Sequence, residues 1–404
     1  MKYLIILGDG MADWPIAELG NKTVLQYADK PYMDMLASKG RTGMLKSVPV
    51  GYHPGSEVAN MAVLGYNLDQ VFEGRGVLEA ANIGVDLKPG QMCMRCNLIC
   101  VENGNIKNHS AGHISTEEAA ELMEYLQEKL GSETVHFHTG IQYRHLLVID
   151  GADKHLECTP PHDVPGQPFM PLLVKPENPQ AAATAEQINN LILESQKILE
   201  NHPINVKRKA EGKDPANSIW PWSAGYRPSM KTLSDRFAFI KSGSVISAVD
   251  LIKGIGHYAG LKVIDVEGAT GLFDTNYANK ANAAIQALRE DDFVYLHVEA
   301  PDEAGHEGNV MLKVRTVQDL DSKLIGPIYE AVKDWDEPVT IAVLPDHPTP
   351  CEHRTHTAEA VPFIIYRPGG EADMVTKYDE DSCKSGVYGV LEAPQFIEKL
   401  FEKQ

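Results

Sequence analysis

The feature of this sequence that most constrains its fold is an apolar run that leads into an aspartate, and it occurs three times. Residues 3–7, 292–298 and 339–344 form these largely apolar runs. A strand whose side chains are apolar on both faces must be covered on both faces, as in the parallel sheets of α/β proteins. Helical periodicity over 277–288 and 314–332 separates the later runs. The outer parts of the chain are therefore expected to form an α/β layer fold.

The middle of the chain has a different pattern. Ser115 and Glu118 form a capping box, which predicts that a helix begins there. A strand is expected over 143–149, and a second helix over 181–200. Seven prolines within 160–179 exclude a regular helix or a regular ladder from that segment.

The segment 220–228, which is rich in tryptophan and proline, is expected to be irregular. The α/β pattern resumes after it, near residue 237. We therefore expect a discontinuous domain that is interrupted by an inserted α/β domain. The expected bounds are 1–88 with 236–404 for the outer domain and 89–235 for the insert.

Length and composition exclude several classes of protein. A chain of 404 residues is long enough for two to three domains. Its net charge of −19 argues against a protein that binds nucleic-acid phosphates. No apolar run approaches the ~20 residues that span a bilayer, and the apolar start is too short for a signal peptide. With only six cysteines, a reducing, cytoplasmic location is expected. The oligomeric state stays open.

The three strand-terminal aspartates are Asp9, Asp302 and Asp346. A lone aspartate at such a place is most often a helix cap or a turn residue. Here, however, the strands would bring all three to one sheet edge, and histidines accompany them: His306, His347 and His356. Carboxylate and imidazole donors without cysteine suit Mn²⁺ or Zn²⁺, and their number suggests two ions.

Ser56 is the candidate nucleophile. It follows the turn Pro54-Gly55 and stands where an apolar helical pattern begins. A helix start offers free N–H groups to a phosphoryl group, and a nearby metal ion would favour the serine alkoxide. The alternative is that Ser56 is only the N-cap of this helix.

The order of these residues along the chain resembles the pattern of the alkaline phosphatase superfamily. The residues are Asp9, Ser56, Asp302, His306, Asp346, His347 and His356. Over nearly its whole length the chain is similar to the cofactor-independent phosphoglycerate mutases of the archaeal type. The further matching blocks are Leu7-Gly8-Asp9-Gly10-Met11, Gly74-Arg75-Gly76-Val77-Leu78-Glu79-Ala80-Ala81, Arg95-Cys96-Asn97-Leu98, Tyr143-Arg144-His145-Leu146-Leu147-Val148 and Ser247-Ala248-Val249-Asp250-Leu251-Ile252-Lys253-Gly254.

The resemblance implies an alkaline-phosphatase-like core sheet covered by helices, with two divalent ions and an active site in the cleft beside the inserted domain. Mn²⁺ is the expected metal, with Zn²⁺, Mg²⁺ and Co²⁺ as alternatives. Ser56 would accept the phosphoryl group of 3-phosphoglycerate or 2-phosphoglycerate and return it to the other hydroxyl of the glycerate. The implied ligands are Asp302, His306 and His356 for one ion, and Asp9, Ser56, Asp346 and His347 for the other.

For the substrate, a small phosphorylated metabolite, the resemblance leaves a list of candidates. Arginines could form paired hydrogen bonds with its phosphate and carboxylate, and an aspartate could move the hydroxyl proton. A surface or interdomain ion pair is the alternative for each arginine. The candidates are Asp163 as the base, with His109, Arg144, Arg227 and Lys253 as substrate-binding residues.

Other functions stay open at this point. The family pattern has an arginine where this chain has His113, and Gly-Gln-Gly where it has Ser223-Ala224-Gly225. These changes lie in the inserted domain and keep a homoserine kinase-like phosphotransferase or a phosphomonoesterase as alternatives. A metal-binding module without turnover is a further one. Because the chain has no phosphate-binding loop for ATP, the mutase is the favoured prediction.

Overall fold

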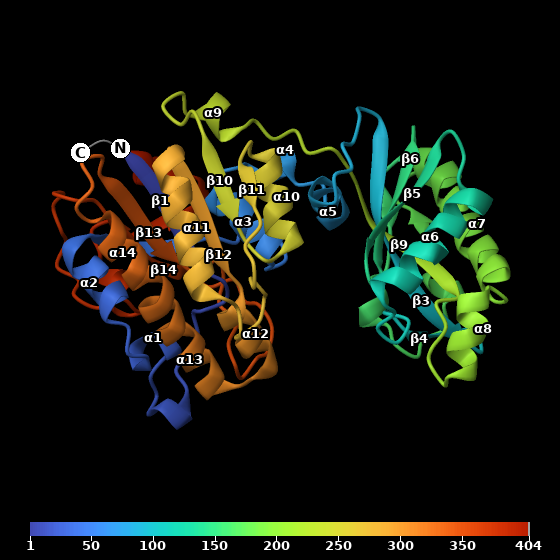
Figure 1. Cartoon of the computed structure of the whole chain (residues 1–404), viewed down its shortest axis with the longest axis horizontal. Coiled ribbons are helices and arrows are strands. Elements are labelled where there is room, and N and C mark those ends of the chain that lie inside the picture. Colours follow the sequence, from blue (N-terminus) through green and yellow to red (C-terminus); the bar gives the residue numbers. More distant parts are fainter. Residues whose placement is uncertain (403–404) are drawn as a thin grey trace. The chain divides into compact units, whose positions relative to one another are not determined.

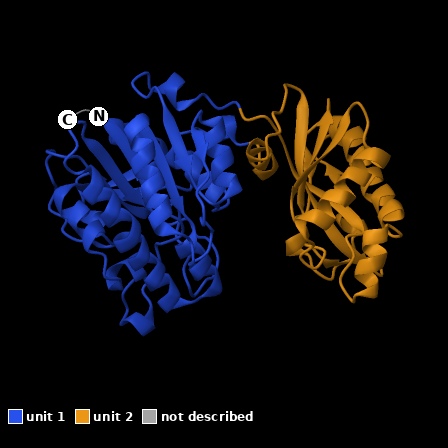
Figure 2. Cartoon of the chain, in the orientation of Figure 1, with its two compact units in different colours: residues 1–72, 229–404 blue, residues 73–228 orange. Residues whose placement is uncertain are grey.

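The computed structural model describes residues 1–402 and divides into two compact units (Figure 2). Unit 1 comprises residues 1–72 and 229–404, and unit 2 comprises Glu73–Pro228. The expected boundaries were 88/89 and 235/236. Unit 2 begins earlier because helix α5 (Arg75–Asn82) packs on strands β3 (Gln91–Glu102) and β9 (Ser218–Tyr226).

Unit 1 is built on one eight-stranded sheet with the order β11-β10-β12-β1-β13-β14-β2-β15 (Figure 1). The central strands are parallel, and only β14 runs antiparallel to its neighbours. This confirms the predicted α/β core. The strands of this sheet are β1 (Lys2–Gly8), β2 (Arg41–Lys46), β10 (Gly243–Ile246), β11 (Lys262–Ile264), β12 (Phe293–Val298), β13 (Val339–Leu344), β14 (Val361–Tyr366) and β15 (Val390–Glu392).

Helices cover both faces of this sheet. One face carries Leu4 and Ile6 of β1, which pack in the same core as α11 (Tyr277–Glu290) and α13 (Val310–Leu320). On the other face, Tyr3 contacts the ring of Phe401. Strand side chains alternate between faces, so adjacent residues of β1 serve two cores. The remaining helices of unit 1 are α1 (Val24–Tyr27), α2 (Pro31–Lys39), α3 (Ser56–Val63), α4 (Leu68–Val71), α9 (Leu233–Arg236), α10 (Asp250–Tyr258), α12 (Ala300–Glu307), α14 (Gly326–Val332) and α15 (Ala393–Phe401).

The register of the three central strands brings their carboxyl ends to one edge. Leu7 of β1 pairs with His297 of β12 on one side and with Leu344 of β13 on the other. The loops that follow the three strands therefore start at the same level of the sheet. In open α/β sheets this edge is where ligands bind.

Unit 2 contains an antiparallel sheet in the order β4-β3-β6-β5, and β9 also pairs antiparallel with β3. Helices α6 and α7 share a core with β3, and Ser115 caps α6 by accepting a hydrogen bond from the Glu118 N–H, as predicted. The remaining elements are β4 (Asn105–Asn108), β5 (Val135–Ile141), β6 (Arg144–Asp150), β7 (Leu156–Glu157), β8 (Lys175–Pro176), α6 (Thr116–Leu130), α7 (Ala182–Leu199) and α8 (Pro203–Ala210).

The prediction of irregular chain over 220–228 was wrong for most of that segment. Residues up to Tyr226 belong to β9, which pairs antiparallel with β3. The pairing shifts register between Cys93 and Arg95, and such a bulge accommodates a strand that contains proline. Among the helices of residues 1–402, none combines the length and the apolarity needed to cross a bilayer.

Candidate active site

The three strand-terminal aspartates meet at the carboxyl edge of the unit 1 sheet. Asp9 follows β1, Asp302 lies in the first turn of α12 and Asp346 follows β13. All three are buried. Together with histidines they form two groups whose ligand atoms lie within 4.8 Å of one another. These groups are Asp302 with His347 and His356, and Asp9 with His297 and Asp346.

Two histidines converge on the carboxylate of Asp302. Nε2 of His306, one helical turn later, lies 3.1 Å from its Oδ2, and Nε2 of His356 lies 3.4 Å from its Oδ1. The two Nε2 atoms are themselves 3.0 Å apart. Burial opposes ionisation of Asp302, but the hydrogen bonds from both histidines hold its pKa well below the ordinary value.

Asp9 and Asp346 form the second group. Nε2 of His347 lies 3.7 Å from Oδ1 of Asp9 and 3.5 Å from Oδ2 of Asp346. Burial, and then the charges of Asp346 and Asp302, raise the pKa of Asp9 well above its ordinary value. The ligand oxygens of Asp9 and Asp346 lie within 4.8 Å of each other. Two buried carboxylates at this distance need positive charge between them.

These residues fit divalent cations. Oδ1 of Asp9 is buried and has no hydrogen-bond partner among the described residues. A buried charge without a partner is costly, and a cation is the partner that a carboxylate cluster of this kind accepts. Oxygen and imidazole donors, with no thiolate among them, are suited to ions such as Mn²⁺ and Zn²⁺.

Ser56 is the first residue of α3, and its hydroxyl faces this cluster. Oγ lies 3.3 Å from Nε2 of His347 and 3.5 Å from Oδ2 of Asp9. The N-cap of α3 is Gly55, and no side chain caps this helix end. The interpretation of Ser56 as a mere N-cap is therefore wrong.

Sequence reasoning missed several buried polar residues that support these side chains. Nε2 of His297 lies 2.9 Å from Oδ2 of Asp9, and Oγ of Ser247 lies 3.1 Å from the other ring nitrogen of His297. Burial lowers the pKa of His297 to about 4, so its ring is neutral. A histidine within an otherwise apolar strand was the available signal.

Thr349 contacts two members of the first group. Its hydroxyl donates to Oδ1 of Asp302 at 2.5 Å and lies 3.3 Å from Nδ1 of His347. Its carbonyl accepts a hydrogen bond from the buried Lys313 ammonium at 2.8 Å. The same ammonium binds the carboxylate of Asp13 at 2.9 Å. Apart from the contact with His347, these contacts join segments that are remote in the chain, and no local sequence signal marks them.

In unit 2, the structure brings some of the predicted substrate-binding residues together. The ring of His109 lies 5.7 Å from that of Tyr143 and 6.1 Å from that of His162. The guanidinium of Arg144 lies 5.6 Å from the Tyr143 ring centre. Asp163 is exposed, with Oδ1 3.6 Å from Nε2 of His162.

Two of the predicted residues have other partners. Arg227 of unit 2 pairs with Asp86 at 2.8 Å. Lys253 belongs to unit 1, on α10, and pairs with Asp265 at 2.6 Å. For Arg227, the surface ion pair that was its alternative is thus what the structure contains.

Two arginines that sequence reasoning did not single out lie in unit 2. Arg95 and Arg75 both pair with Glu79, at 3.3 and 3.9 Å. Their Nε atoms are buried and have no hydrogen-bond partner among the described residues. Burial lowers the pKa of Arg95, and the charges of Arg75 and Arg144 act in the same direction while Glu79 opposes them. Arg75 and Arg95 thus share one carboxylate, and the charge of Arg144 also acts on Arg95.

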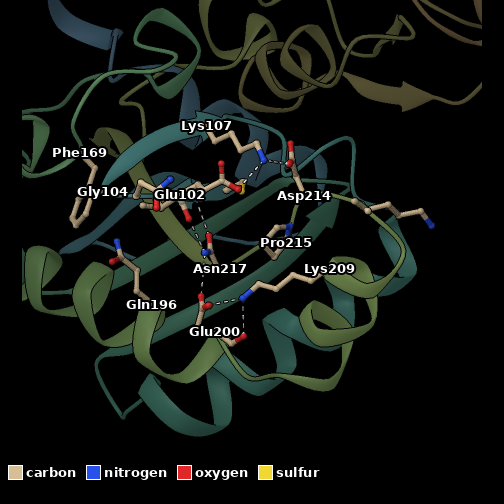
Figure 3. Close-up of a pocket in the computed structure, with 15 residues that line it drawn as sticks. Glu102, Gly104, Lys107, Phe169, Gln196, Glu200, Lys209, Asp214, Pro215 and Asn217 are labelled. Carbon is tan, nitrogen blue, oxygen red and sulfur yellow. Dashed lines mark hydrogen bonds and ion pairs between the residues drawn. The ribbon is translucent and has the colours of Figure 1, made fainter.

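Unit 2 also contains a pocket of about 590 Å³ near β3, β4, α7 and α8 (Figure 3). Its three lysines are paired: Lys107 with Glu102 and Asp214, Lys209 with Glu200, and Lys213 with Glu211. None of its fifteen lining residues is a predicted site residue. This pocket has balanced charge and is separate from the residues described above.

Comparison with known proteins finds a family model and relatives that carry the same description. Residues 37–205 match a family model described as 2,3-bisphosphoglycerate-independent phosphoglycerate mutase. A protein of that name from Methanosarcina acetivorans is 50% identical over 99% of both chains. A probable one from Geobacter sulfurreducens is 44% identical over the full length of both.

Solved structures give a similar result. A Pyrococcus horikoshii protein superposes with a TM-score of 0.84 at 28% identity, covering 100% of this chain and 98% of the other. The cofactor-independent phosphoglycerate mutase from Thermoplasma acidophilum gives 0.70 at 27% identity, with 99% of each chain covered.

Proposed function

Because the chain belongs to the family of 2,3-bisphosphoglycerate-independent phosphoglycerate mutases, we propose that it interconverts 3-phosphoglycerate and 2-phosphoglycerate through Ser56. The observation that supports this most strongly is the position of Ser56. It is the first residue of α3, and its hydroxyl lies beside His347 and Asp9. A serine in that place has a cation site on one side and free helix N–H groups on the other.

We propose that the cluster holds two divalent ions, preferably Mn²⁺. Asp302, His306 and His356 would hold one, and Asp9, Ser56, Asp346 and His347 the other. Support comes from the convergence of these side chains and from Oδ1 of Asp9, which is buried and accepts no hydrogen bond from any residue that the structure describes. When bound, such ions supply positive charge to phosphoryl oxygens and favour ionisation of the serine hydroxyl.

The proposed transfer needs no external phosphoryl donor. The Ser56 hydroxyl loses its proton and Oγ attacks phosphorus; the bond from phosphorus to the C3 oxygen breaks, and that oxygen takes up a proton. The C2 hydroxyl of the same glycerate then loses its proton and attacks the phosphoserine; the bond from phosphorus to Oγ breaks, and Oγ of Ser56 takes up a proton. Peptide N–H groups in the first turn of α3 would donate hydrogen bonds to the phosphoryl oxygens.

We propose that unit 2 supplies the substrate-binding side chains. Arg75, Arg95 and Arg144 would bind the carboxylate and phosphate of the glycerate, as guanidinium groups do in pairs of hydrogen bonds. These three arginines carry more positive charge than the single carboxylate of Glu79 balances. Such a local excess, in a chain whose net charge is −19, supports this.

His109 lies in the same aromatic cluster as Tyr143 and would contact the substrate there. Asp163, which is exposed beside His162, would move the proton of the glycerate hydroxyl. Arg227 and Lys253 would have to leave Asp86 and Asp265 to take part. We therefore propose Arg75 and Arg95, rather than Arg227 and Lys253, as substrate-binding residues.

The test is an assay of the Mn²⁺-loaded protein with 3-phosphoglycerate, in the absence of ATP and of 2,3-bisphosphoglycerate. We expect 2-phosphoglycerate to form, and a bisphosphate primer to add nothing. Parallel reactions with Zn²⁺, Mg²⁺ and Co²⁺ rank the metals. If 2-phosphoglycerate is absent and O-phosphohomoserine forms from homoserine and ATP, the proposal is wrong and the kinase alternative is right. Release of inorganic phosphate alone would indicate a phosphomonoesterase.

A further inference from the structure

Asn60 lies one helical turn after Ser56 on α3 and is completely buried. Its Nδ2 donates to the carbonyl of Ser56 at 2.8 Å and to Oδ2 of Asp346 at 2.9 Å. Its Oδ1 accepts a hydrogen bond from the hydroxyl of Tyr295 at 2.6 Å. The amide therefore connects three elements: α3, the loop after β13 and strand β12.

The orientation of this amide is fixed by Tyr295. That tyrosine is buried, and burial, together with the charges of Asp346 and Asp9, raises the pKa of its hydroxyl well above the ordinary value. The hydroxyl is therefore protonated and donates its hydrogen bond to Oδ1 of Asn60. The NH₂ group must then face the carboxylate, because an asparagine amide has only one acceptor atom.

The other contacts of Asp346 show what Asn60 adds. Oδ1 of Asp346 accepts hydrogen bonds from the N–H groups of Gly10 and His347, at 3.1 and 2.9 Å. Oδ2 accepts from Asn60 and faces Nε2 of His347 at 3.5 Å. The two backbone donors hold one oxygen of the carboxylate, and Asn60 holds the second, which is the oxygen that faces the cluster.

We propose that Asn60 is a positioning residue, which fixes the nucleophile Ser56 and the carboxylate of Asp346 relative to one another. The proposal rests on the proposed function of Ser56. Since residues i and i+4 lie on the same helix face, a movement of α3 against the sheet would break the contact with Asp346. Partners of this kind orient ligand carboxylates, and their loss typically costs 10- to 100-fold in metal affinity or activity.

The test compares Asn60→Leu with Asn205→Leu. Leucine has a similar volume but cannot donate, so the Asp346 contact is lost. Asn205 is a matched control in unit 2: it is buried, its Nδ2 donates to the carbonyls of Leu199 and Ala216, and its Oδ1 accepts from the N–H of Ala216. Both variants lose three hydrogen bonds, but only the substitution at Asn60 lies beside Ser56.

For Asn60→Leu we expect kcat to fall about 10- to 100-fold and the Kd for Mn²⁺ to rise by a similar factor. KM for 3-phosphoglycerate should change little, because the proposed anion-binding arginines are in unit 2. Asn205→Leu should lose comparable unfolding stability and keep both kcat and the Kd for Mn²⁺. If the two variants lose the same stability and both keep wild-type kcat and Mn²⁺ affinity, Asn60 is merely structural.

Tyr295→Phe keeps the core filled and tests the same link if Asn60→Leu does not fold. It removes only the donor that orients the amide, so kcat and Mn²⁺ affinity should both decrease. Wild-type values for both would overturn the proposal. A wild-type protein that binds Mn²⁺ but makes no 2-phosphoglycerate would instead refute the proposed function, and the Mn²⁺ measurement would still decide the role of Asn60.

Discussion

The hydroxyl oxygen of Ser56 lies 3.3 Å from Nε2 of His347, although 291 positions separate the two residues in the chain. Strand register explains this contact. Leu7 of β1 pairs with Leu344 of β13, so the loops that carry Asp9 and His347 leave the sheet side by side. The start of α3 is then held against them by Asn60. A serine hydroxyl, two carboxylates and an imidazole thus share one sheet edge.

Neutralising one aspartate in either ligand group should reduce metal content. We expect the wild-type protein to bind about two Mn²⁺ per chain, in line with two-metal phosphoryl-transfer sites. Asp302→Asn and Asp346→Asn should each lose about one ion, because each removes a charge that the site presents to a cation. Elemental analysis after gel filtration measures this. Asp321→Asn, a buried aspartate outside both groups, is the control, and unchanged metal in the first two variants would refute the assignment.

Removing the guanidinium of Arg95 should weaken substrate binding. Arg95→Met keeps much of the buried side-chain volume, and KM for 3-phosphoglycerate should rise roughly 10- to 100-fold, as charge-assisted hydrogen bonds contribute roughly 1.5–3 kcal/mol. Mn²⁺ binding should not change. Arg227→Met is the control, because Arg227 pairs with Asp86 at an exposed position. Steady-state kinetics decide between them: a larger effect at Arg227 than at Arg95 would contradict our choice of residues.

The buried ion pair of Lys313 and Asp13 should be important for stability. Lys313→Met leaves a buried carboxylate without its cation, which typically costs about 3–5 kcal/mol of unfolding free energy. Adding Asp13→Asn should restore part of the loss. The exposed pair of Lys175 and Glu157 should contribute less than about 1 kcal/mol. Urea unfolding of wild type, Lys313→Met, the double variant and Lys175→Met measures these differences, and a loss below about 1 kcal/mol in Lys313→Met would contradict the prediction.

Glu380 should make the protein less stable as the pH rises. Burial raises the pKa of this carboxyl to about 7 from 4.5, although Thr23 and Asp13 donate hydrogen bonds to it. Below about pH 4.5 it is protonated in both the folded and the unfolded chain. Above that, the unfolded chain ionises first, so the contribution of Glu380 to stability is lost as the pH rises through about 7.

Glu380→Gln imitates the protonated acid and removes this dependence. Its stability relative to wild type should therefore increase by roughly 1–3 kcal/mol from about pH 5 to about pH 8. Urea unfolding at the two pH values gives the difference. The exposed Glu371→Gln is the control and should show no such trend. A constant difference between Glu380→Gln and wild type would refute the argument.

The sequence was sufficient to predict those parts of the site that follow from strand geometry. Asp9, Asp302 and Asp346 could be placed together because parallel strands end at one edge, and His306 because four residues make one helical turn. The outer α/β layers followed from apolar runs and helical periodicity. These inferences need only local patterns and one rule about sheets.

The remainder depends on pairing between distant segments. β9 could not be recognised from its tryptophans and prolines, because its pairing with β3 and the bulge at Cys93 and Arg95 are properties of the folded unit. The Arg75 and Arg95 pair likewise exists only because α5 packs on β3. Thr349 has no local motif, since its partners other than His347 come from distant parts of the chain.

The proposed reaction requires that Ser56 carry the phosphoryl group between the two hydroxyls of one glycerate. The most direct measurement is mass spectrometry of the Mn²⁺-loaded protein, quenched in acid during turnover of 3-phosphoglycerate without ATP or 2,3-bisphosphoglycerate. We predict phosphate on the peptide that contains Ser56, and neither phosphopeptide nor 2-phosphoglycerate from Ser56→Ala. Phosphate on a different residue, or 2-phosphoglycerate formed at the wild-type rate by Ser56→Ala, would contradict the claim.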